Sequence, residues 1–591
     1  MRNTSQKGWT RRDWIGGSLA LGGAASLPAA AGPATPASLA PSAAGGAGRP
    51  VFRIGVNLGL INDWSSELPF VDLMRIARPW STRDGSGTWD TGHAARLRCD
   101  ADGYPIGLPQ TVDGKPVWVQ TIWTNASLWP TGRYTVLHAG QGEIRFLQGA
   151  KSLKREGPGR WTFELGLDAP NAPLVLHLIR SKPEDPLRDL RVLMPGHEAS
   201  HREQPFNPAF LRALKPFDSV RFMDWGATNN WGQKGRGDWD QPELFDADRR
   251  QTPGHYTWAD GRGVPYEVMI RLMNAAGLDG WVNVPHRASP GYIRHMAALF
   301  RDGLNRERKL VVEYSNETWN WAFGQTKWLG KHGEASAHAL RANPLAGSQW
   351  PERMTGHVQR CLDLWTEVYG AQRPGRLIRV AGGQTASFNQ SKRVLEGLRP
   401  GSFDAMTASW YFSLKSDFVG SVEAGVRRDG SLDRLGEKAT VADIAAAVRG
   451  SWERDKDWLR KLHERVAKPL GLPVLYYEGG QHLTPQPHGY DAYAGDGSGR
   501  AGPRYREALV DAMRSPEMGQ LYREWFDFMQ QEMARGPEPL WLMHFGFIAP
   551  LKANTTRFGL FSLLERVDQD PAGPVPAPRY QAVIEAMQRR R

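Results

Sequence analysis

The stretch KLVVEYSNETW, residues 309–319, is an apolar run that ends in polar and aromatic residues. Its first part is apolar almost throughout, which is typical of a strand that is covered on both faces. The same arrangement recurs along the chain, as a short β-branched or aromatic run followed by a segment with helical spacing. The predicted strands are 52–58, 219–225, 280–285, 309–315, 376–381, 403–410, 473–477 and 539–545.

Segments with helical spacing lie between these strands, for example at 265–276, 358–369, 455–466, 506–533 and 579–587. Strands that alternate with helices predict a parallel sheet, and eight such strands are the number that closes a barrel. The alternative is an open, doubly wound sheet, which needs a glycine-rich phosphate turn after its first strand; the sequence NLG at 57–59 does not match that turn. The predicted fold class is therefore α/β, a (β/α)8 TIM barrel.

A long segment between the first two strands, residues 81–195, follows a different pattern. Its apolar residues alternate with polar ones at 117–119, 134–137, 143–146, 161–165 and 174–179, with turn residues between them. Several short strands of this kind predict an antiparallel β-sandwich inserted into the barrel. The catalytic barrel is then assigned to residues 50–80 and 196–591. The sandwich either binds glycan or braces the barrel, and we favour bracing.

The amino terminus has the features of an export signal. Arg11 and Arg12 precede an apolar stretch rich in Gly and Ala and the small-residue sequence 29–31, a pattern that resembles a twin-arginine signal peptide. Residues 1–31 are predicted to be this signal, and residues 32–49 an Ala/Pro/Gly linker. The alternative is an uncleaved anchor, which the shortness of the apolar stretch disfavours. We expect an exported, periplasmic or extracellular protein with no membrane contact after cleavage.

The composition of the 591 residues narrows the class of function. The presence of only two cysteines, Cys99 and Cys361, excludes a disulfide scaffold and a cysteine-based zinc site, and we expect neither a metal nor another cofactor. The net charge of +12 is spread along the chain, whereas a nucleic-acid-binding protein concentrates positive charge on one element. We therefore expect no nucleic-acid partner; an acidic polysaccharide partner is the alternative interpretation of the charge. We also expect the protein to be a monomer.

Two glutamates lie at predicted strand ends, where the catalytic groups of a barrel are found. Glu317 follows the fourth strand in the sequence SNET, and Glu478 follows the seventh in YYEGG. These strands lie on opposite sides of an eight-stranded barrel, so the two side chains can face each other across its mouth. Retaining hydrolysis of a glycosidic bond needs two carboxyl groups about 5–5.5 Å apart, one as nucleophile and one as acid/base.

These strand ends resemble those of clan A glycoside hydrolases, the family 5-like retaining enzymes with (β/α)8 barrels. The sequence EYSNE at 313–317 is similar to the E-x-x-N-E of many family 5 members, and the resemblance follows the strand order of the whole barrel. It implies that Glu317 is the acid/base, Glu478 the nucleophile, and Asn316 the partner of the sugar 2-hydroxyl. It also implies that Arg221 keeps the nucleophile ionised and that Tyr411 hydrogen-bonds to it.

Two positions depart from the family 5 pattern and favour a neighbouring family with the same machinery. Ser409 stands where family 5 has the His of H-x-Y, and Thr318 replaces the Pro after Asn-Glu. Burial and the neighbouring carboxylate are expected to raise the pKa of Glu317, so that it can donate a proton. Glu313 lies deeper on the same strand, and we expect it to make structural hydrogen bonds.

The 24 tryptophans are an unusually large number and suggest flat stacking surfaces for sugar rings. The candidate platforms fall just after predicted strand ends and are Trp64, Trp225, Trp231, Trp319, Trp321 and Trp410. His286, after the third strand, and His544, in the eighth, are candidates for binding sugar hydroxyls.

Together these features predict an exported retaining glycoside hydrolase that cleaves β-glycosidic bonds of a polysaccharide or oligosaccharide, with a β-glucan favoured. Two alternatives stay open. One is a glycosidase that acts on an acidic or mixed glycan, and the other is a non-catalytic carbohydrate-binding protein on the same barrel. The presence of both glutamates favours the enzyme.

Overall fold

The computed structural model describes residues 48–169, 172–231, 240–413, 440–483, 503–551 and 560–590. The predicted signal peptide, residues 1–31, and almost all of the predicted linker lie outside the described residues. Within the described ranges, no helix combines the length and the hydrophobicity that a membrane span requires.

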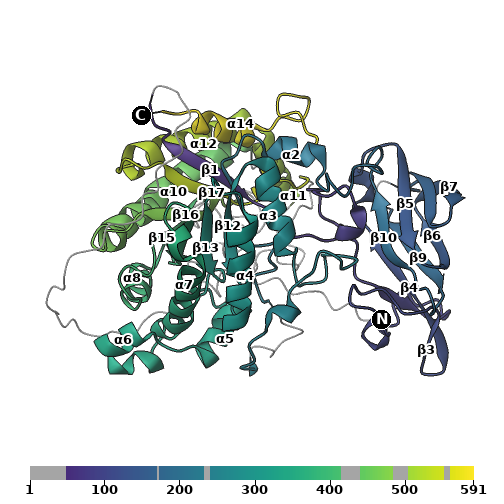
Figure 1. Cartoon of the computed structure of the whole chain (residues 1–591). Coiled ribbons are helices and arrows are strands. Elements are labelled where there is room, and N and C mark those ends of the chain that lie inside the picture. The colour runs from purple at the N-terminus through teal and green to yellow at the C-terminus, as the bar shows by residue number, and fades with distance from the viewer. Residues whose placement is uncertain are drawn as a thin grey trace, which may run out of the picture.

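Parallel strands close into a barrel in the order in which they occur along the chain (Figure 1). They are β1 (Phe52–Asn57), β11 (Ser219–Arg221), β12 (Asp279–Val284), β13 (Leu310–Tyr314), β14 (Leu377–Ala381), β15 (Ala405–Phe412), β16 (Val474–Gln481) and β17 (Leu540–His544). The closing pair is β1 with β17, in register from Phe52–Leu540 to Val56–His544. The prediction of a (β/α)8 barrel is confirmed, and every predicted strand overlaps an observed one.

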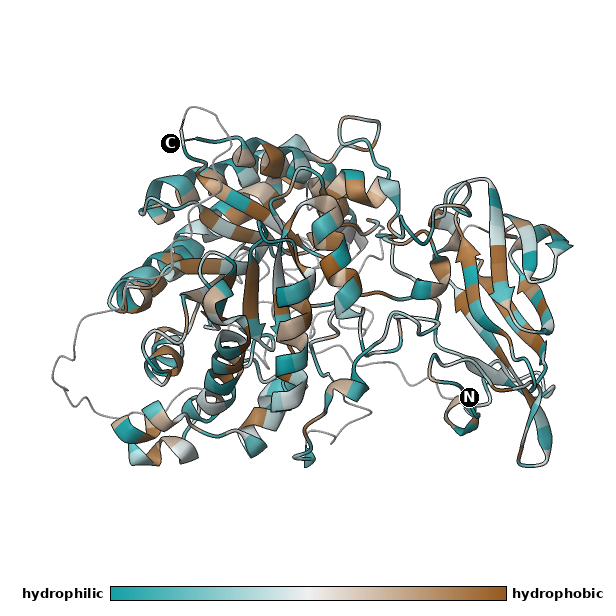
Figure 2. Cartoon of the chain, viewed as in Figure 1, coloured by the Kyte–Doolittle hydropathy of each residue, from teal (hydrophilic) through white to brown (hydrophobic). Residues whose placement is uncertain are grey.

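Helices surround the barrel and cover the outer faces of its strands (Figure 1). They are α2 (Pro208–Leu214), α3 (Tyr266–Ala276), α4 (Pro290–Gly303), α5 (Gly324–His332), α6 (Ala337–Ala342), α7 (Thr355–Tyr369), α8 (Phe388–Glu396), α10 (Val441–Leu462), α11 (Pro503–Arg514), α12 (Pro516–Phe528) and α14 (Pro578–Met587). Because helices cover one side and the barrel interior the other, every residue of β12, β13 and β14 is buried. Hydrophobic colour therefore gathers in the strands and on the inner faces of the helices (Figure 2).

The predicted helical segment 506–533 is helical, but it is divided into α11, α12 and a π-helical turn at Met529–Met533. The side chain of Ser515 accepts a hydrogen bond from the N–H of Met518 and so caps the start of α12, whose first residue is Pro516. A proline inside a helix removes a backbone hydrogen bond and clashes with the preceding turn, whereas at the first position it is well tolerated. The chain therefore ends one helix and begins another.

An antiparallel β unit, residues 81–193, follows β1 and lies to one side of the barrel (Figure 1). Its strands are β2 (Ser81–Arg83), β3 (Gln110–Val112), β4 (Lys115–Trp123), β5 (Arg133–Ala139), β6 (Gly142–Gln148), β7 (Ala150–Gly157), β8 (Arg160–Leu165), β9 (Leu174–Ser181) and β10 (Arg188–Leu193). One sheet has the order β10-β5-β8-β7 and the other β2-β4-β9-β6, with β3 paired to β4. The accessory antiparallel fold is therefore confirmed.

The β unit holds the loop that follows β1. The N–H groups of Thr124 and Asn125 both donate to the carbonyl of Asp63, at 2.9 and 3.0 Å. The same loop carries Trp64 and Glu67, which lie one and four residues further along the chain. Contacts of this kind are what bracing of the barrel requires.

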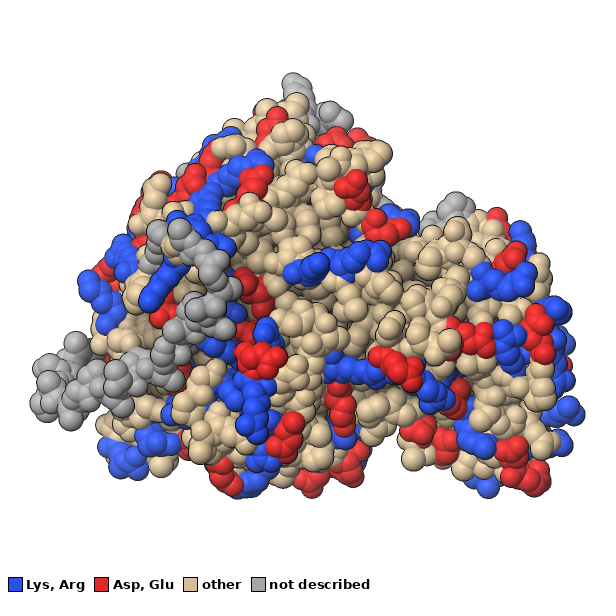
Figure 3. Space-filling model, turned by 45° about the horizontal axis from the view of Figure 1, so that its top comes forward, with Lys and Arg blue, Asp and Glu red and all other residues tan. Residues whose placement is uncertain are grey.

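Charged side chains of both signs are mixed over the face shown in Figure 3, and neither sign gathers into one large patch there. Among the described residues, many charged side chains form surface ion pairs, such as Arg160 with Glu198 at 2.7 Å. The positive net charge is thus spread over the surface of this face.

Candidate active site

The turn after β13 carries Asn316 and Glu317. Ser315 and Glu317 both have positive φ, 57° and 41°, a region that residues with side chains rarely adopt and that is common at functional sites. The Ser315 N–H donates to the Val284 carbonyl at 2.8 Å, and the Ser315 carbonyl accepts from Asn283 Nδ2 at 2.6 Å. The neighbouring strand β12 therefore holds the turn in this shape.

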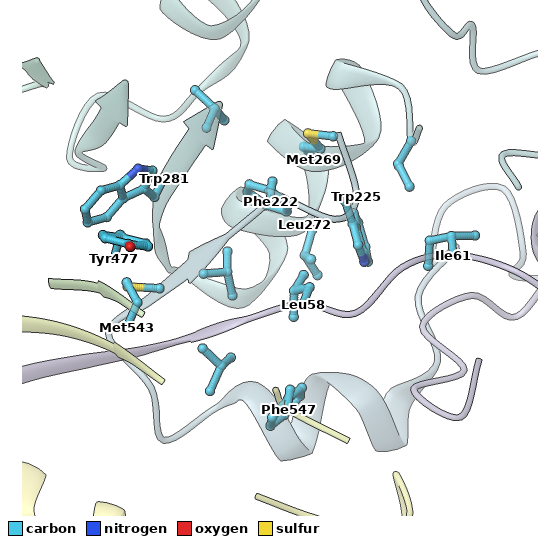
Figure 4. Packing of buried hydrophobic residues seen from close by; sticks show 14 of the residues in the cluster. Leu58, Ile61, Phe222, Trp225, Met269, Leu272, Trp281, Tyr477, Met543 and Phe547 are labelled. Atoms are coloured by element: carbon cyan, nitrogen blue, oxygen red, sulfur yellow. The ribbon is translucent and has the colours of Figure 1, made fainter. Parts of the chain in front are cut away.

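Arg221, the last residue of β11, is the centre of the hydrogen-bond network at this end of the barrel. Its side chain is fully buried, and the rings of Trp281 and Tyr477 lie 5.5 and 5.1 Å from its guanidinium carbon. Figure 4 shows these two rings next to each other. The two terminal nitrogens of Arg221 donate over 2.8–3.0 Å to Glu478, Asn57, Glu313 and Asn316.

Glu478 is 7% exposed and bonds through both carboxylate oxygens. Its Oε1 accepts from Arg221 at 3.0 Å, and its Oε2 accepts from the hydroxyl of Tyr411 at 3.0 Å. Burial raises the pKa of Glu478, and the negative charge of Glu317 raises it further, while Arg221 and Tyr411 lower it. The direct ion pair with Arg221 is what favours the ionised form of this carboxyl.

Glu317 is 9% exposed and accepts only neutral hydrogen-bond donors among the described residues. The Tyr477 hydroxyl donates to its Oε1 at 2.7 Å, and the Asn320 amide donates to its Oε2 at 2.8 Å. Burial raises the pKa of Glu317 by more than these hydrogen bonds lower it. Because the two carboxyls interact, their protons are lost in coupled steps. Glu478 has the direct ion pair with Arg221 and Glu317 does not, so the first proton bound by the pair is expected on Glu317.

An extra residue in β16 lets two consecutive side chains reach the site. Ala408 of β15 pairs with Tyr476, but the next residue, Ser409, pairs with Glu478, so Tyr477 is a β-bulge. In a regular strand, consecutive side chains point to opposite faces. A bulge re-aims a side chain, as is common beside active sites, and here both Tyr477 and Glu478 contact the same network.

Glu313 has the structural role expected of it. Its Oε2 accepts from Arg221 at 3.0 Å, from Trp281 Nε1 at 3.0 Å and from Asn283 Nδ2 at 2.8 Å. These donors lie inside the barrel, and Glu313 is buried beneath the turn that carries Glu317. It therefore helps to fix Arg221.

Four side-chain amides that position the site were not singled out from the sequence, those of Asn57, Asn229, Asn320 and Gln325. Asn57 donates to the carbonyls of Tyr477 and His544, both at 3.1 Å, and Asn316 donates to Asn229 Oδ1 at 3.1 Å. Gln325 donates to Asn229 and to the Asn316 carbonyl, and Asn320 holds Glu317. Only Asn57 had a signal, because it is the residue before the end of the first predicted strand, 52–58.

Trp225 and Trp410 are fully buried, and the prediction that they stack on sugar rings is wrong. Trp225 packs among aromatic and aliphatic residues, as its neighbours Phe222 and Leu272 show in Figure 4. Trp410 donates through Nε1 to the Met543 carbonyl at 2.9 Å. Large apolar side chains that follow a strand fill the layer between strands and helices, so their position after a strand did not imply exposure.

Trp319 and Trp231 are also buried, whereas Trp64 and Trp321 are 57% and 45% exposed. Trp321 lies four residues after Glu317, and its ring contacts that of Trp350, with centroids 4.8 Å apart. Two of the six candidate platforms are therefore available to a ligand.

His286 and His544 are both buried, which contradicts the prediction that they bind hydroxyls of a ligand. His544 Nε2 lies 2.8 Å from the hydroxyl of Tyr522. The ring of His286 lies edge-on to that of Trp328, with centroids 5.6 Å apart. Burial lowers the pKa of each histidine to about 3, so both are neutral and act as packing residues.

Among the described residues, no group of three or more His, Cys, Asp and Glu side chains could hold a metal ion. No family model and no curated protein matches the chain.

Solved structures similar to this chain include a GH5 xyloglucan-specific endo-β-1,4-glucanase from a metagenomic library, with 11% identity, a TM-score of 0.31, and coverage of 66% of this chain and 92% of that one. A family 51 α-L-arabinofuranosidase from Bifidobacterium longum has 13% identity, a TM-score of 0.33, and coverage of 67% and 68%. A GH5-4 broad specificity endoglucanase from Clostridum cellulovorans has 10% identity, a TM-score of 0.30, and coverage of 66% and 90%. Similarities this low assign the chain to no family, so its activity has to be inferred from the geometry of the barrel mouth.

Proposed function

We propose that this protein is an exported, monomeric retaining glycoside hydrolase that cleaves β-glycosidic bonds of a polysaccharide or oligosaccharide, a β-glucan being favoured. The observation that supports the proposal is the pair of interacting buried carboxyls after β13 and in β16. Among the described residues, Glu478 has a guanidinium partner and Glu317 has only neutral donors. Retaining hydrolysis needs this difference, since one carboxyl must be ionised and the other protonated.

In the proposed first step, Glu478 attacks the anomeric carbon while Glu317 gives its proton to the leaving oxygen, so the glycosidic C–O bond breaks and a glycosyl–Glu478 ester forms. In the second step, Glu317 takes a proton from water, the water oxygen attacks the same carbon, and the ester bond to Glu478 breaks. Two inversions restore the configuration. Arg221 would stabilise Glu478 whenever it is ionised, and Asn316 would bind the 2-hydroxyl of the sugar.

The test is turnover of a panel of aryl β-glycosides and plain β-glucans by the wild-type chain and by Glu478→Gln. We expect turnover by the wild type and none by Glu478→Gln, because the amide cannot form the ester. The exposed Glu203→Gln is the matched control and should keep full activity. Saturable binding of glucan by the wild type without turnover of any substrate would instead favour the carbohydrate-binding protein.

A further inference from the structure

Two further carboxyls, those of Glu67 and Asp224, lie in the loops that follow the paired strands β1 and β11. Glu67 comes from the loop after β1 and is 2% exposed. Its Oε1 accepts from the Gly59 N–H at 2.8 Å, and its Oε2 has no hydrogen-bond partner in the part of the chain that the structure describes. Asp224 comes from the loop after β11 and is partly exposed, and among the described residues its carboxyl makes no hydrogen bond or salt bridge. A buried oxygen without a donor is rare in a folded protein and needs an explanation.

Asp224 lies three residues after Arg221, which binds Glu478, and Asn229 of the same loop accepts a hydrogen bond from Asn316. This loop and the one that carries Glu67 follow the paired strands β11 and β1. In agreement with this placement, burial and the charge of Asp224 raise the pKa of Glu67 to about 8, against the hydrogen bond from Gly59, and the charge of Asp224 raises the pKa of Glu478. Asp224 is therefore a partly exposed carboxyl in the loop next to the nucleophile, and Glu67 is a buried carboxyl in the neighbouring loop.

We infer that Asp224, backed by Glu67, binds hydroxyl groups of the sugar that Glu478 attacks, and that this pair selects an uncharged sugar and rejects a uronate at that position. The inference rests on the proposed function. A sugar hydroxyl both donates and accepts hydrogen bonds, so an ionised Asp224 can accept from it. A protonated Glu67 stays neutral behind Asp224 and adds no repulsion.

A uronate would bring a further negative charge next to Asp224 and Glu478. Like charges repel strongly where burial lowers the effective dielectric constant. An amino sugar would be attracted to the same carboxyls, but the positive net charge of the chain works against the approach of a cationic polymer. An uncharged, hydroxyl-rich sugar is therefore the ligand that fits.

The experiment compares 4-nitrophenyl β-glucoside with the β-glucuronide, and the β-galactoside with the β-galacturonide, because each pair differs only at C6. The wild type should turn over the neutral member of a pair at least about 100-fold better in kcat/KM. Asp224→Asn should lower kcat/KM on the neutral substrate by about 10- to 100-fold, as expected for loss of a charged hydrogen bond. The ratio of kcat/KM between the neutral substrate and its uronide should fall by about tenfold or more. The acid limb of the pH profile of kcat/KM should also move to lower pH in Asp224→Asn, because removal of a negative charge lowers the pKa of Glu478.

Asp248→Asn is the matched control, since Asp248 is exposed in the same β11–β12 connection and should leave the ratio and the pH profile unchanged. Asp224→Ser removes the same charge with a smaller side chain and should show the same change in ratio. Thermal melting of both Asp224 variants checks that they fold.

If Glu478→Gln is inactive but Asp224→Asn keeps the wild-type ratio and pH profile, the inference is overturned and the proposed function stands. If the wild type turns over no glycoside, both fall. A preference for the aryl β-glucosaminide that disappears in Asp224→Asn would also overturn the inference and would make the site cation-selective.

Discussion

The hydroxyl of Tyr477 donates a 2.7 Å hydrogen bond to Glu317, across the barrel from the strand that carries Tyr477 itself. Its chain neighbour Glu478 receives the matching hydrogen bond from Tyr411 at 3.0 Å. Each of the two proposed catalytic carboxyls therefore accepts a hydrogen bond from one tyrosine. The bulge in β16 directs Tyr477 towards Glu317, while the next residue, Glu478, is bound by Tyr411.

The two tyrosines should tune opposite limbs of the pH profile. Each hydroxyl lowers the pKa of the carboxyl that it binds. Tyr411→Phe should therefore raise the pKa of Glu478 and move the acid limb of kcat/KM to higher pH. Tyr477→Phe should raise the pKa of Glu317 and move the basic limb to higher pH. A hydrogen bond worth about 0.5–1.5 kcal/mol corresponds to a shift of about 0.4–1 pH unit. Movement of the same limb in both variants would contradict the assignment of roles.

Arg221→Met should destabilise the fold as well as abolish activity. The substitution leaves Glu313 and Glu478 buried without their cation, and removal of one partner from a buried pair costs about 3–5 kcal/mol of unfolding free energy. Chemical denaturation measures this loss. Arg160→Met removes a surface ion pair instead, for which about 0–1 kcal/mol is expected. Equal losses in the two variants would show that the Arg221 network is not a buried ion pair in solution.

Arg221→Lys separates charge from geometry. Lysine restores the positive charge but carries one ammonium group, which cannot reproduce the fork that reaches both carboxylates and both amides. We expect this variant to recover part of the stability lost in Arg221→Met while kcat/KM stays low. Full recovery of kcat/KM would mean that charge alone keeps Glu478 competent.

Glu67→Gln should be more stable than the wild type, by a margin that widens as the pH rises. The pKa of Glu67 is raised from 4.5 to about 8 by burial. Between these values the unfolded chain has lost the proton and the folded chain has kept it, so the wild type loses up to about 1.4 kcal/mol of stability per pH unit. Glutamine is neutral in both states and escapes this loss. The thermal midpoint of the variant should exceed that of the wild type by an amount that grows from pH 4.5 to 8 and then levels off. The exposed Glu203→Gln should show no such trend.

The fold could be predicted because every barrel strand is covered on both faces. Such strands read as continuous apolar runs, and β13 with its buried sequence LVVEY is an example. The strands of the β unit have one buried face and one more exposed face, as in the alternating burial of β6. The alternation of apolar and polar residues was therefore visible in the sequence as well. The helix break at Pro516 was missed because apolar spacing continues across it.

The site could be predicted only where a residue's role follows from its place at a strand end. Glu317, Glu478 and Arg221 belong to this class. Tyr477 could not be found, because a bulge changes where a side chain points without leaving a mark in the sequence. Trp225 could not be told from an exposed platform, because an aromatic residue after a strand suits the core and a ligand surface equally well.

Trp64 and Trp321 should contribute to binding of long chains and not to the chemical step. Both are exposed, and an aromatic ring that stacks on a flat partner contributes about 0.5–1.5 kcal/mol, or up to about tenfold in affinity. Trp64→Ala and Trp321→Ala should therefore lower kcat/KM on a soluble β-glucan by up to about tenfold and leave an aryl monosaccharide substrate unchanged. Trp89→Ala is the control, because Trp89 is exposed in the β unit. An equal effect of Trp89→Ala on the glucan would show that the β unit binds glycan and does more than brace the barrel.

Glu317→Ala should separate substrates by the quality of their leaving group. The variant lacks the proton donor, which matters most when the leaving group is poor. Cleavage of a glucan should fall by about 10²–10⁴-fold, the range typical of general acid–base catalysis, whereas the first step on an activated aryl glycoside should survive. Azide can enter the space left by the side chain and attack the glycosyl–Glu478 ester. The product should be a β-glycosyl azide, because two inversions restore the configuration, and NMR of the product gives its anomeric form. Equal losses on good and poor leaving groups without azide rescue would remove Glu317 as the acid/base, and an α-glycosyl azide would remove the double displacement itself.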